Sequence, residues 1–449
     1  MNTENDRKSA TNETVNNLIR LIQCETVNPP GNELPAILVI KEILEREGFP
    51  KEDLVILESA PGRVNLVARL HGDGSQRPLM LSGHVDVVPV EREKWSHDPF
   101  GGELINGEIW GRGALDMKGF LAMYLQIFLQ IRRANLPLKR DLILTAVADE
   151  ENGFTHGSQF LVEKHRDLIN AEYAFTEGGA FPIYLGKTKA YMIQVAEKGM
   201  CWLRMTASGK PGHGSLPHDD NAVVHLAKAI DNIRQTGHLP VHITPTFKSM
   251  LKAASGQVRW PLGALSGWLK NPGLVNTILG LAKGPMRSML VAMTTNTCTP
   301  TVLRAGSKTN VIPSTAEVLL DCRKLPGQSP EDVQREVMKA CGGGVILETI
   351  LATDGAEVSS ETPLYATLER HTRKMDPEGI IIPFLMPGAT DASQYQKAGI
   401  QTYGFTPGLV PPEYPSMTLG HGHNERLPIT FIESGLPVLW DVINEVCVK

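Results

Sequence analysis

Acidic and histidine side chains directly follow three apolar segments that are typical of β-strands. The segments are 79–82, followed by His84 and Asp86; 142–147, followed by Asp149, Glu150 and Glu151; and 173–176, followed by Glu177. Because ligands of open α/β sheets bind at the carboxyl ends of the strands, these side chains are expected to share one rim. Carboxylates brought together there would raise one another's pKa values, a conflict that bound cations remove.

Two further segments offer metal ligands, and they carry Asp116 (in WGRGALDMKG) and His421 (in HGHNERL). A set of carboxylates and imidazoles without thiolates favours zinc, with cobalt or manganese as alternatives. Two ions that share a bridging carboxylate would polarise a carbonyl oxygen and lower the pKa of a water between them. One carboxylate must then stay off the metal to take the proton of that water, and the neighbours Glu150 and Glu151 suit this division.

The segments GHVDVVP, GRGALDMKG, DEENG, EGG, GHGSLPH and HGHNE resemble motifs of the M20 metallopeptidase family, in the family's order. The resemblance runs from Thr26 to Leu427, nearly the whole chain. That family includes the aminoacylases, acetylornithine deacetylase, succinyl-diaminopimelate desuccinylase, glutamate carboxypeptidases and carnosinase-like dipeptidases. The resemblance implies one metal site made by His84, Asp116 and Glu177 and another made by Asp116, Glu151 and His421, so that Asp116 bridges two ions.

The resemblance also implies roles for residues that are not ligands. Asp86 would orient the imidazole of His84 and raise its basicity. Glu150 would be the general base and then the acid for the leaving amine. His213, in GHGS, matches a family histidine that stabilises the tetrahedral intermediate and that reaches into the partner's site in dimeric members. A homodimer is therefore expected.

Substrate binding is expected at three places in the second half of the chain. Asn310 and Arg323 match positions of the family that bind substrate, and Arg323 can hold a carboxylate with two hydrogen bonds. Gly388 and Thr390 lie in a segment, GATD, that matches a substrate-side loop. At the family position that corresponds to Glu177, deacylases and carboxypeptidases carry a glutamate, whereas aminopeptidases and dipeptidases carry an aspartate. The resemblance thus favours a small N-acyl amino acid or a short C-terminal peptide as substrate.

Strands and helices alternate around these residues, which predicts an α/β fold with a mixed, mostly parallel sheet and helices on both faces. The apolar run 119–131 is expected to be a helix that is buried all round. From residue 195 the pattern changes to a smaller α+β unit of the β-α-β-β-α-β type. We expect a catalytic domain at 1–194 and 357–449, interrupted by a lid or dimerisation domain at 195–356.

The inserted domain contains a long segment, 242–299, that is rich in Leu, Gly, Met and Trp. Apolar runs at 274–281 and 286–293 predict helices within it. The segment could cover the active-site cleft or form a subunit interface, and the sequence leaves both alternatives open.

Composition limits the classes of partner. The 449 residues carry a formal net charge of -5, without the basic excess that nucleic acid or an anionic membrane would require. The six cysteines are scattered, which favours reduced thiols and a cytoplasmic location. The polar N-terminus does not resemble a signal peptide.

Other interpretations compete with this one. A dipeptidase or aminopeptidase could use the same scaffold, and a metal-binding regulatory protein without catalysis is the alternative from another class. Arg323 could be a structural ion-pair partner, and His423 could be confused with the expected ligand His421. Similarly, His218 lies close to His213 in the sequence and could be confused with it.

Overall fold

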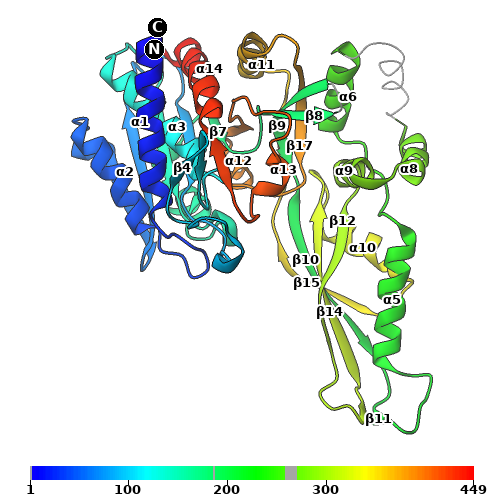
Figure 1. Ribbon diagram of the computed structural model, residues 1–449. Helices are drawn as coiled ribbons and strands as arrows, with labels where there is room; N and C mark the ends of the chain where they lie inside the picture. The colour runs from blue at the N-terminus through cyan, green and yellow to red at the C-terminus, as the bar shows by residue number, and fades with distance from the viewer. Residues whose placement is uncertain (1–2, 186–187, 258–270) are drawn as a thin grey trace. The chain divides into compact units, whose positions relative to one another are not determined.

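The computed structural model describes residues 3–185, 188–257 and 271–449, which form two compact units (Figure 1). Unit 1 comprises Met1–Val195, Val358–Pro383 and Thr390–Lys449, and unit 2 comprises Ala196–Glu357 and Phe384–Ala389. Unit 2 overlaps the inserted domain predicted at 195–356 and contains, in addition, the short segment 384–389. Among the described residues, no helix is long and apolar enough to cross a membrane.

The larger sheet has ten strands in the described ranges, in the order β1-β2-β6-β3-β7-β18-β9-β16, with β8 and β17 also paired to β9. The strands are β1 (Leu54–Ala60), β2 (Arg63–Leu70), β3 (Leu79–His84), β6 (Leu142–Val147), β7 (Tyr173–Thr176), β8 (Pro182–Leu185), β9 (Thr188–Glu197), β16 (Ala356–Glu357), β17 (Ile380–Met386) and β18 (Gln401–Gly404). The central strands β6, β3, β7 and β18 are parallel, and antiparallel strands flank them on both sides. The expected mixed α/β sheet is confirmed, but most pairs of described strands are antiparallel and the parallel pairs lie in these four central strands, so the sheet is not mostly parallel as the sequence predicted.

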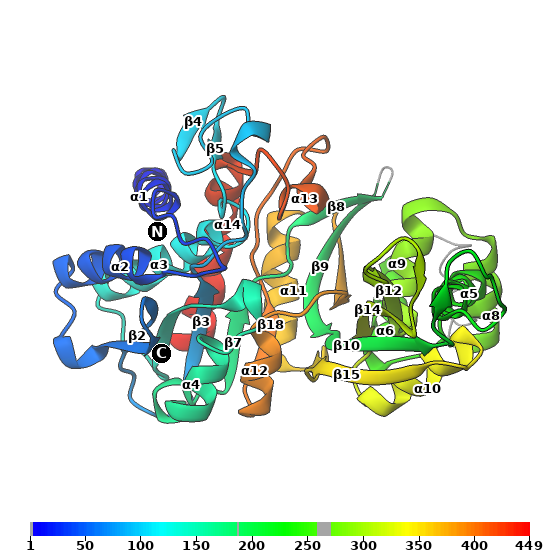
Figure 2. The ribbon, with the colours of Figure 1, turned by 90° about the horizontal axis from the view of Figure 1, so that it is seen from below.

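Helices cover both faces of this sheet. One apolar core contains residues of α1 (Glu4–Ile22), α2 (Leu34–Arg46), α3 (Lys118–Arg133), α11 (Pro363–Met375) and α14 (Ile429–Cys447). A second core contains residues of α4 (Ser158–Lys164) and α12 (Ala392–Lys397), which lie on the side of the strands away from α1 and α2 (Figure 2). Ile143 and Leu144 of β6 belong to different cores because neighbouring strand residues face opposite ways.

Helix α3 is buried on every side, as the sequence predicts, since each residue from Lys118 to Leu129 is buried. The helix begins at Lys118, two residues after Asp116, so its packing in the core fixes the backbone close to Asp116. A small antiparallel sheet in unit 1 lies in the order β19-β5-β4, formed by β4 (Glu103–Ile105), β5 (Glu108–Trp110) and β19 (Arg426–Pro428). Strand β19 follows the segment of His421, and the short helix α13 (Ser416–Leu419) precedes it.

Unit 2 is built on a four-stranded antiparallel sheet in the order β12-β14-β10-β15. Its elements are β10 (Gly199–Ser208), β11 (Gly212–His213), α5 (Ala222–Thr236), β12 (Thr297–Ala305), β13 (Val311–Ile312), β14 (Thr315–Lys324), α10 (Pro330–Cys341) and β15 (Ile346–Ala352). Alternate residues of β10 and β14 are buried against α5 and α10. The intervening residues, Asp321 and Arg323 among them, therefore face away from these helices.

The segment 242–299 contributes three described helices, α6 (Pro245–Gln257), α8 (Pro272–Leu281) and α9 (Gly284–Thr294). The apolar runs that predict helices at 274–281 and 286–293 lie within α8 and α9. Residues 258–270 of this segment lie outside the described residues.

Candidate metal centre

The carboxyl ends of β3, β6 and β7 bring together the side chains that follow them. His84 is the last residue of β3, Glu150 and Glu151 lie in the turn after β6, and Glu177 follows β7. Because β3 is parallel to both neighbouring strands, the three ends lie at the same edge of the sheet. Asp149 starts the turn with a left-handed backbone, φ 66°, which turns the chain abruptly at this edge.

Two groups of three side chains meet at this edge, and they share Asp116. His84, Asp116 and Glu177 form one group, and Asp116, Glu151 and His421 form the other. In each group, the three ligand atoms lie within 4.8 Å of one another. These are the two ligand sets that the family resemblance implies.

The two carboxylate oxygens of Asp116 face different imidazoles. Oδ1 lies 3.2 Å from Nε2 of His84, and Oδ2 lies 3.2 Å from Nε2 of His421. His84 Nε2 is also 3.8 Å from Glu177 Oε1, and His421 Nε2 is 3.0 Å from Glu151 Oε2. Ligands about 2.1 Å from a tetrahedral zinc ion lie about 3.4 Å apart, so these spacings suit a divalent cation in each group.

A buried oxygen without a partner supports the same fit. Among the described residues, Oε1 of Glu151 has no hydrogen-bond partner, although it is buried. A buried anionic oxygen without a partner is costly, and a cation held by Asp116, Glu151 and His421 would compensate its charge. The donor set of imidazole nitrogens and carboxylate oxygens is one that divalent zinc, cobalt or manganese accepts.

Burial and crowding shift the pKa values of these groups. Burial, together with the negative charge of Asp116, raises the pKa of Glu177 to about 8. Burial also raises the pKa of Glu151. Hydrogen bonding to Asp116 and Glu151 raises the pKa of His421 to about 10. The carboxylates of Asp116, Glu151 and Glu177 thus repel one another, and two bound cations would relieve this repulsion.

Glu150 lies beside the ligands, in a group with His84 and Glu151 whose atoms are also within 4.8 Å of one another. Burial raises the pKa of Glu150 well above its ordinary value, and the charge of Glu177 acts in the same direction. Whereas Glu151 contacts His421, Glu150 belongs to neither group that contains Asp116. The two neighbours therefore have different surroundings, as a ligand and a base require.

Asp86 binds the backbone of the turn that carries both glutamates, a contact that its expected role at His84 does not include. Its Oδ1 accepts the backbone N–H of Glu150 at 3.2 Å, and its Oδ2 accepts that of Glu151 at 3.2 Å. The imidazole of His84 has Nδ1 3.0 Å from the backbone carbonyl oxygen of Asp86 and 3.5 Å from Oδ1. The backbone carbonyl is thus the closer partner of His84, and the carboxylate mainly binds the turn.

A buried ion pair supports Asp116 and His421. Glu425 accepts the backbone N–H groups of Leu115 at 2.8 Å and Asp116 at 3.0 Å, and it pairs with Arg112 at 2.6 Å. Arg112 also donates to the carbonyl oxygen of His421 at 3.4 Å. This role of Glu425 was not predicted, although the residue lies in the HGHNE segment that carries His421. His423 from the same segment is not in the ligand groups of the described residues and lies 3.8 Å from Glu91.

Unit 2 contains His213 and Asn310 side by side. Strand β11, which ends at His213, pairs with β13, and Gly214 N–H donates to the carbonyl oxygen of Asn310 at 2.9 Å. Both residues are exposed. Nδ1 of His213 lies 2.7 Å from the hydroxyl of Ser215. The nearby His218 differs, since neither of its ring nitrogens has a hydrogen-bond partner among the described residues.

Two of the other residues predicted to bind substrate, Arg323 and Thr390, have protein partners. Arg323 is paired with Asp321 through Nε at 2.8 Å and Nη2 at 3.2 Å, which is the structural ion pair that the sequence left open. Gly388, in unit 2, is partly buried. Thr390, in unit 1, is buried, and its hydroxyl accepts the N–H of Ala392 at 3.2 Å near the start of α12.

Comparison with known proteins identifies the chain's relatives. The model of Peptidase family M20/M25/M40 matches residues 80–445. Aminoacylase-1 of Sus scrofa is 28% identical over 432 residues, which cover 94% of this chain and 92% of the relative. An M20 family metallo-carboxypeptidase of Sulfolobus solfataricus is 20% identical with a TM-score of 0.72, covering 96% of this chain and 98% of that one. A di-peptidase of Saccharomyces cerevisiae is 15% identical with a TM-score of 0.69, covering 98% and 97%.

The chain belongs to Peptidase family M20/M25/M40, because the family model matches most of its length. The solved structures show that the fold extends over nearly the whole chain. The protein is accordingly a metallohydrolase of amide or peptide bonds, and the predicted family is confirmed.

Proposed function

We propose that this protein is a two-metal amidohydrolase that cleaves N-acyl amino acids or short peptides with a free carboxylate. The observation that carries the proposal is the pair of ligand groups sharing Asp116, with Glu150 beside them. His84, Asp116 and Glu177 would hold one ion, and Asp116, Glu151 and His421 the other. Zinc is the favoured metal, with cobalt or manganese as alternatives.

The bound cations would supply the Lewis acidity that polarises the scissile carbonyl and acidifies a water molecule. Glu150 takes a proton from that water and later delivers it to the leaving nitrogen. Its surroundings support this role, since burial favours the protonated carboxyl that must donate in the second half of the reaction. Asp86 keeps Glu150 in place by accepting its backbone N–H. His213 would stabilise the charge that develops on the carbonyl oxygen.

The substrate class rests on fewer observations. Glu177, rather than an aspartate, supports a deacylase or carboxypeptidase, in keeping with the similarity to aminoacylase-1. The pair of Arg323 with Asp321 uses Nε and Nη2, so Nη1 is the nitrogen that the pair leaves for a substrate carboxylate. Asn310, Gly388 and Thr390 are proposed to line the rest of the substrate site. A dipeptidase on the same scaffold is the alternative, supported by the fold shared with a di-peptidase.

A substrate panel tests this proposal. The protein is loaded with zinc, cobalt or manganese, bound metal is counted, and initial rates are compared for N-acetyl amino acids, their C-terminal amides and free dipeptides. We expect two ions per chain, cleavage of the N-acetyl amino acids, and much slower cleavage of the amides. Hydrolysis of free dipeptides alone would contradict the deacylase assignment, and faster cleavage of the amides would contradict carboxylate recognition.

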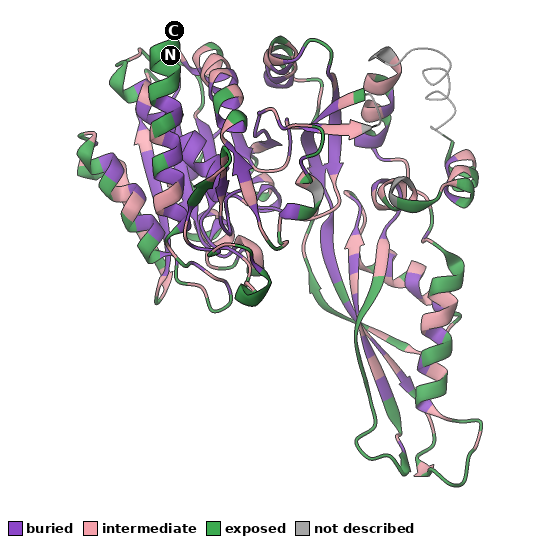
Figure 3. Ribbon diagram, viewed as in Figure 1, coloured by how far each residue is buried: buried purple, intermediate pink, exposed green. Residues whose placement is uncertain are grey.

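A homodimer is proposed on the exposed apolar surface of unit 2. A groove between α5 and β12 is lined by Val223, Leu226, Ala227, Ile230 and Leu303. Figure 3 shows α5 with mostly exposed and intermediate residues, and Leu303 is 64% exposed. Among the described strands, β12 lies at the edge of its sheet, where a second copy could extend the sheet by backbone pairing. Sedimentation velocity of the metal-loaded protein tests this, and a fully active monomer would contradict it.

A cytoplasmic location is likewise a proposal. It is supported by the sparse and scattered cysteines, which are free thiols in the structure. Measuring the distribution of the protein between cell fractions in its own organism tests it, and recovery outside the cytoplasm would contradict it.

A further inference from the structure

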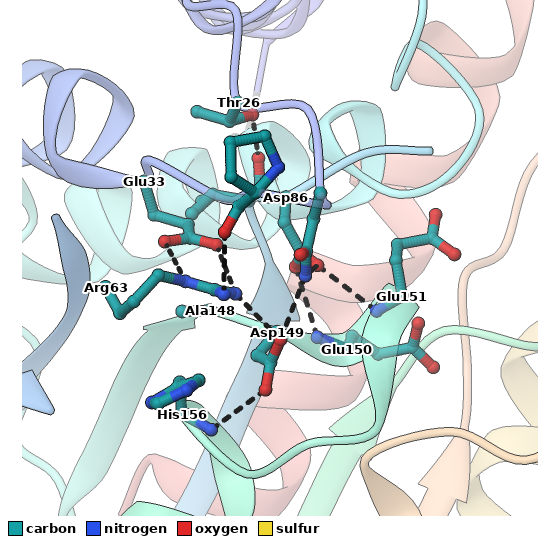
Figure 4. Close-up of polar contacts among 12 residues, drawn as sticks. Thr26, Glu33, Arg63, Asp86, Ala148, Asp149, Glu150, Glu151 and His156 are labelled. Atoms are coloured by element: carbon teal, nitrogen blue, oxygen red, sulfur yellow. Dashed lines mark hydrogen bonds and ion pairs between the residues drawn. The ribbon is translucent and has the colours of Figure 1, made fainter. Parts of the chain in front are cut away.

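A buried polar network lies behind the turn of Glu150 and Glu151, within unit 1 (Figure 4). Its centre is Arg63, the first residue of β2, whose side chain is 8% exposed. Arg63 binds Glu33 with two hydrogen bonds, Nε to Oε2 and Nη2 to Oε1, each 2.9 Å long. The side chain of Glu33 is 0% exposed, so this pair is almost completely desolvated.

The same guanidinium reaches the turn. Nη2 of Arg63 also donates to Oδ1 of Asp149 at 2.8 Å, and Asp149 is 2% exposed. The other oxygen of Asp149 accepts the backbone N–H of His156 at 3.0 Å. Asp149 therefore ties the left-handed start of the turn to β2 on one side and to the following loop on the other. The next two residues are Glu150 and Glu151.

Asn28 connects Asp149 to Asp86, the second carboxylate that holds the turn. Its Nδ2 donates to Asp149 Oδ1 at 3.0 Å and to Asp86 Oδ2 at 2.9 Å. Asp86 in turn accepts the backbone N–H groups of Glu150 and Glu151. The turn is thus held through its backbone by Asp86 and through its first side chain by Arg63, with Asn28 joining the two carboxylates.

Stability alone is a weak reason for such a network. A buried ion pair commonly contributes no more stability than apolar residues of the same size, because desolvation offsets the attraction. Here one guanidinium is shared by two buried carboxylates, and a third, Asp86, is joined to them through Asn28. What the arrangement does specify is geometry, since the fork of an arginine fixes both partners at once.

We propose that Arg63, with Glu33 and Asn28, is a positioning device for the proposed reaction: it sets the place of Glu150 and Glu151 through Asp149 and Asp86. None of the three belongs to the ligand groups formed by the described residues. They act through other residues and are positioning residues. The inference rests on the proposed function, because it assigns Glu150 as the base and Glu151 as a ligand.

Gly31 offers a way to move the guanidinium without changing any charge. A Cβ at Gly31, where φ is 81°, would lie 2.3 Å from Cζ of Arg63 and 2.6 Å from its Nε. Gly48 is the matched control, since its φ is 73° and a Cβ there meets nothing within 4 Å. Gly31→Ala and Gly48→Ala impose similar backbone strain, and only the first displaces Arg63.

A second pair of variants tests the fork itself. Arg63→Lys keeps the positive charge but cannot bind Glu33 and Asp149 with the same planar geometry. Arg69→Lys is the control on the same strand, where Arg69 pairs with Asp141 at 2.7 Å. Each variant is first compared by near-UV circular dichroism and thermal melting, so that rates and metal binding are expressed per folded chain.

We expect Gly31→Ala and Arg63→Lys to lower kcat about tenfold or more, with KM little changed, and to weaken zinc affinity measured by competition with a chromogenic chelator. The control variants should match the unsubstituted enzyme in both measurements. Equal kcat and equal zinc affinity in Gly31→Ala and Gly48→Ala, or in Arg63→Lys and Arg69→Lys, would overturn the positioning role.

The two proposals fail in distinguishable ways. If the unsubstituted protein hydrolyses nothing in the substrate panel, the proposed function fails. Zinc affinity alone then decides whether Arg63 positions Glu151: weaker binding in Gly31→Ala than in Gly48→Ala would still support it, and equal binding would overturn it. If the unsubstituted enzyme is active and the pairs do not differ, only the positioning inference is lost.

Discussion

The candidate ligands at the rim of unit 1, the sheet edge where β3, β6 and β7 end, are buried or partly buried apart from the exposed His421, whereas His213 and Asn310 in unit 2 are exposed. At the rim, His84 is fully buried, and the backbone of Asp116 is fixed by the buried Glu425. In unit 2, His213 and Asn310 are exposed on short paired strands and their loops.

This difference separates two kinds of catalytic requirement. Ligands and a base must be fixed before substrate arrives, because a displacement of about 1 Å can cost about a hundredfold in rate. Side chains that contact the substrate or a developing charge can instead be ordered when the substrate binds or when another chain packs against them. We therefore expect substitutions of the candidate ligands and their supports to change metal binding as well as chemistry. Substitutions of the base Glu150 or of the residues in unit 2 should change chemistry alone.

The largest effect is expected for Glu150→Gln. This change removes the proton acceptor and leaves the two ligand groups that share Asp116 intact, so kcat should fall by about 10²–10⁴ while bound metal stays the same. The neighbouring change Glu151→Gln is the comparison, and it should lower bound metal as well. Metal analysis and initial rates on the same samples check this. Full activity of Glu150→Gln would remove Glu150 from the mechanism.

The next largest effect is expected for His213→Ala in unit 2. If the imidazole stabilises charge on the carbonyl oxygen, kcat should fall by about 10²–10³ with a smaller change in KM, and bound metal should not change. His218→Ala is the comparison because His218 lies five residues further along the chain. Steady-state kinetics of both variants check this. An unchanged kcat in His213→Ala, or an equal loss in His218→Ala, would contradict the assignment.

The fold was predictable wherever apolar periodicity was strong. Helix α3 and the central strands are continuous apolar runs, and their burial follows directly. Helix α1 was not predicted, because its buried side includes Thr11, Thr14 and Asn17, so its apolar period is weak. Its clearest local signal is the capping box, in which Thr3 and Asp6 each accept the other's backbone N–H.

The candidate ligands were predictable because each stands next to a strand end or in a motif of the chain. The buried ion pairs that hold these ligands in place were not predictable. Arg63 and Asp149 are 86 residues apart in sequence, and Arg112 and Glu425 are 313 apart. Each of these residues has a charged side chain of the kind that usually lies on a surface, and nothing local marks it as buried. Only the fold brings these partners together. For Arg63 and Asp149, it does so by pairing β2 with β6.

The smallest of these effects is expected for Glu425→Gln, and it tests whether the rim depends on residues that never contact a metal. The amide keeps one acceptor for the N–H groups of Leu115 and Asp116 but loses the charge that binds Arg112. Metal affinity should fall by about 10–100-fold, and kcat at saturating metal should change less.

Glu108→Gln is the matched control for Glu425→Gln, since Glu108 pairs with Arg426 at 2.9 Å on the adjacent small sheet. Both changes neutralise a glutamate that is paired with an arginine in unit 1, but only Glu425 binds the backbone of Asp116. Competition titrations with a chelator measure the affinity of each variant. Equal affinities would mean that Asp116 is fixed without the charge of Glu425, and a loss confined to Glu425→Gln would show that the position of Asp116 depends on the charged pair of Glu425 and Arg112.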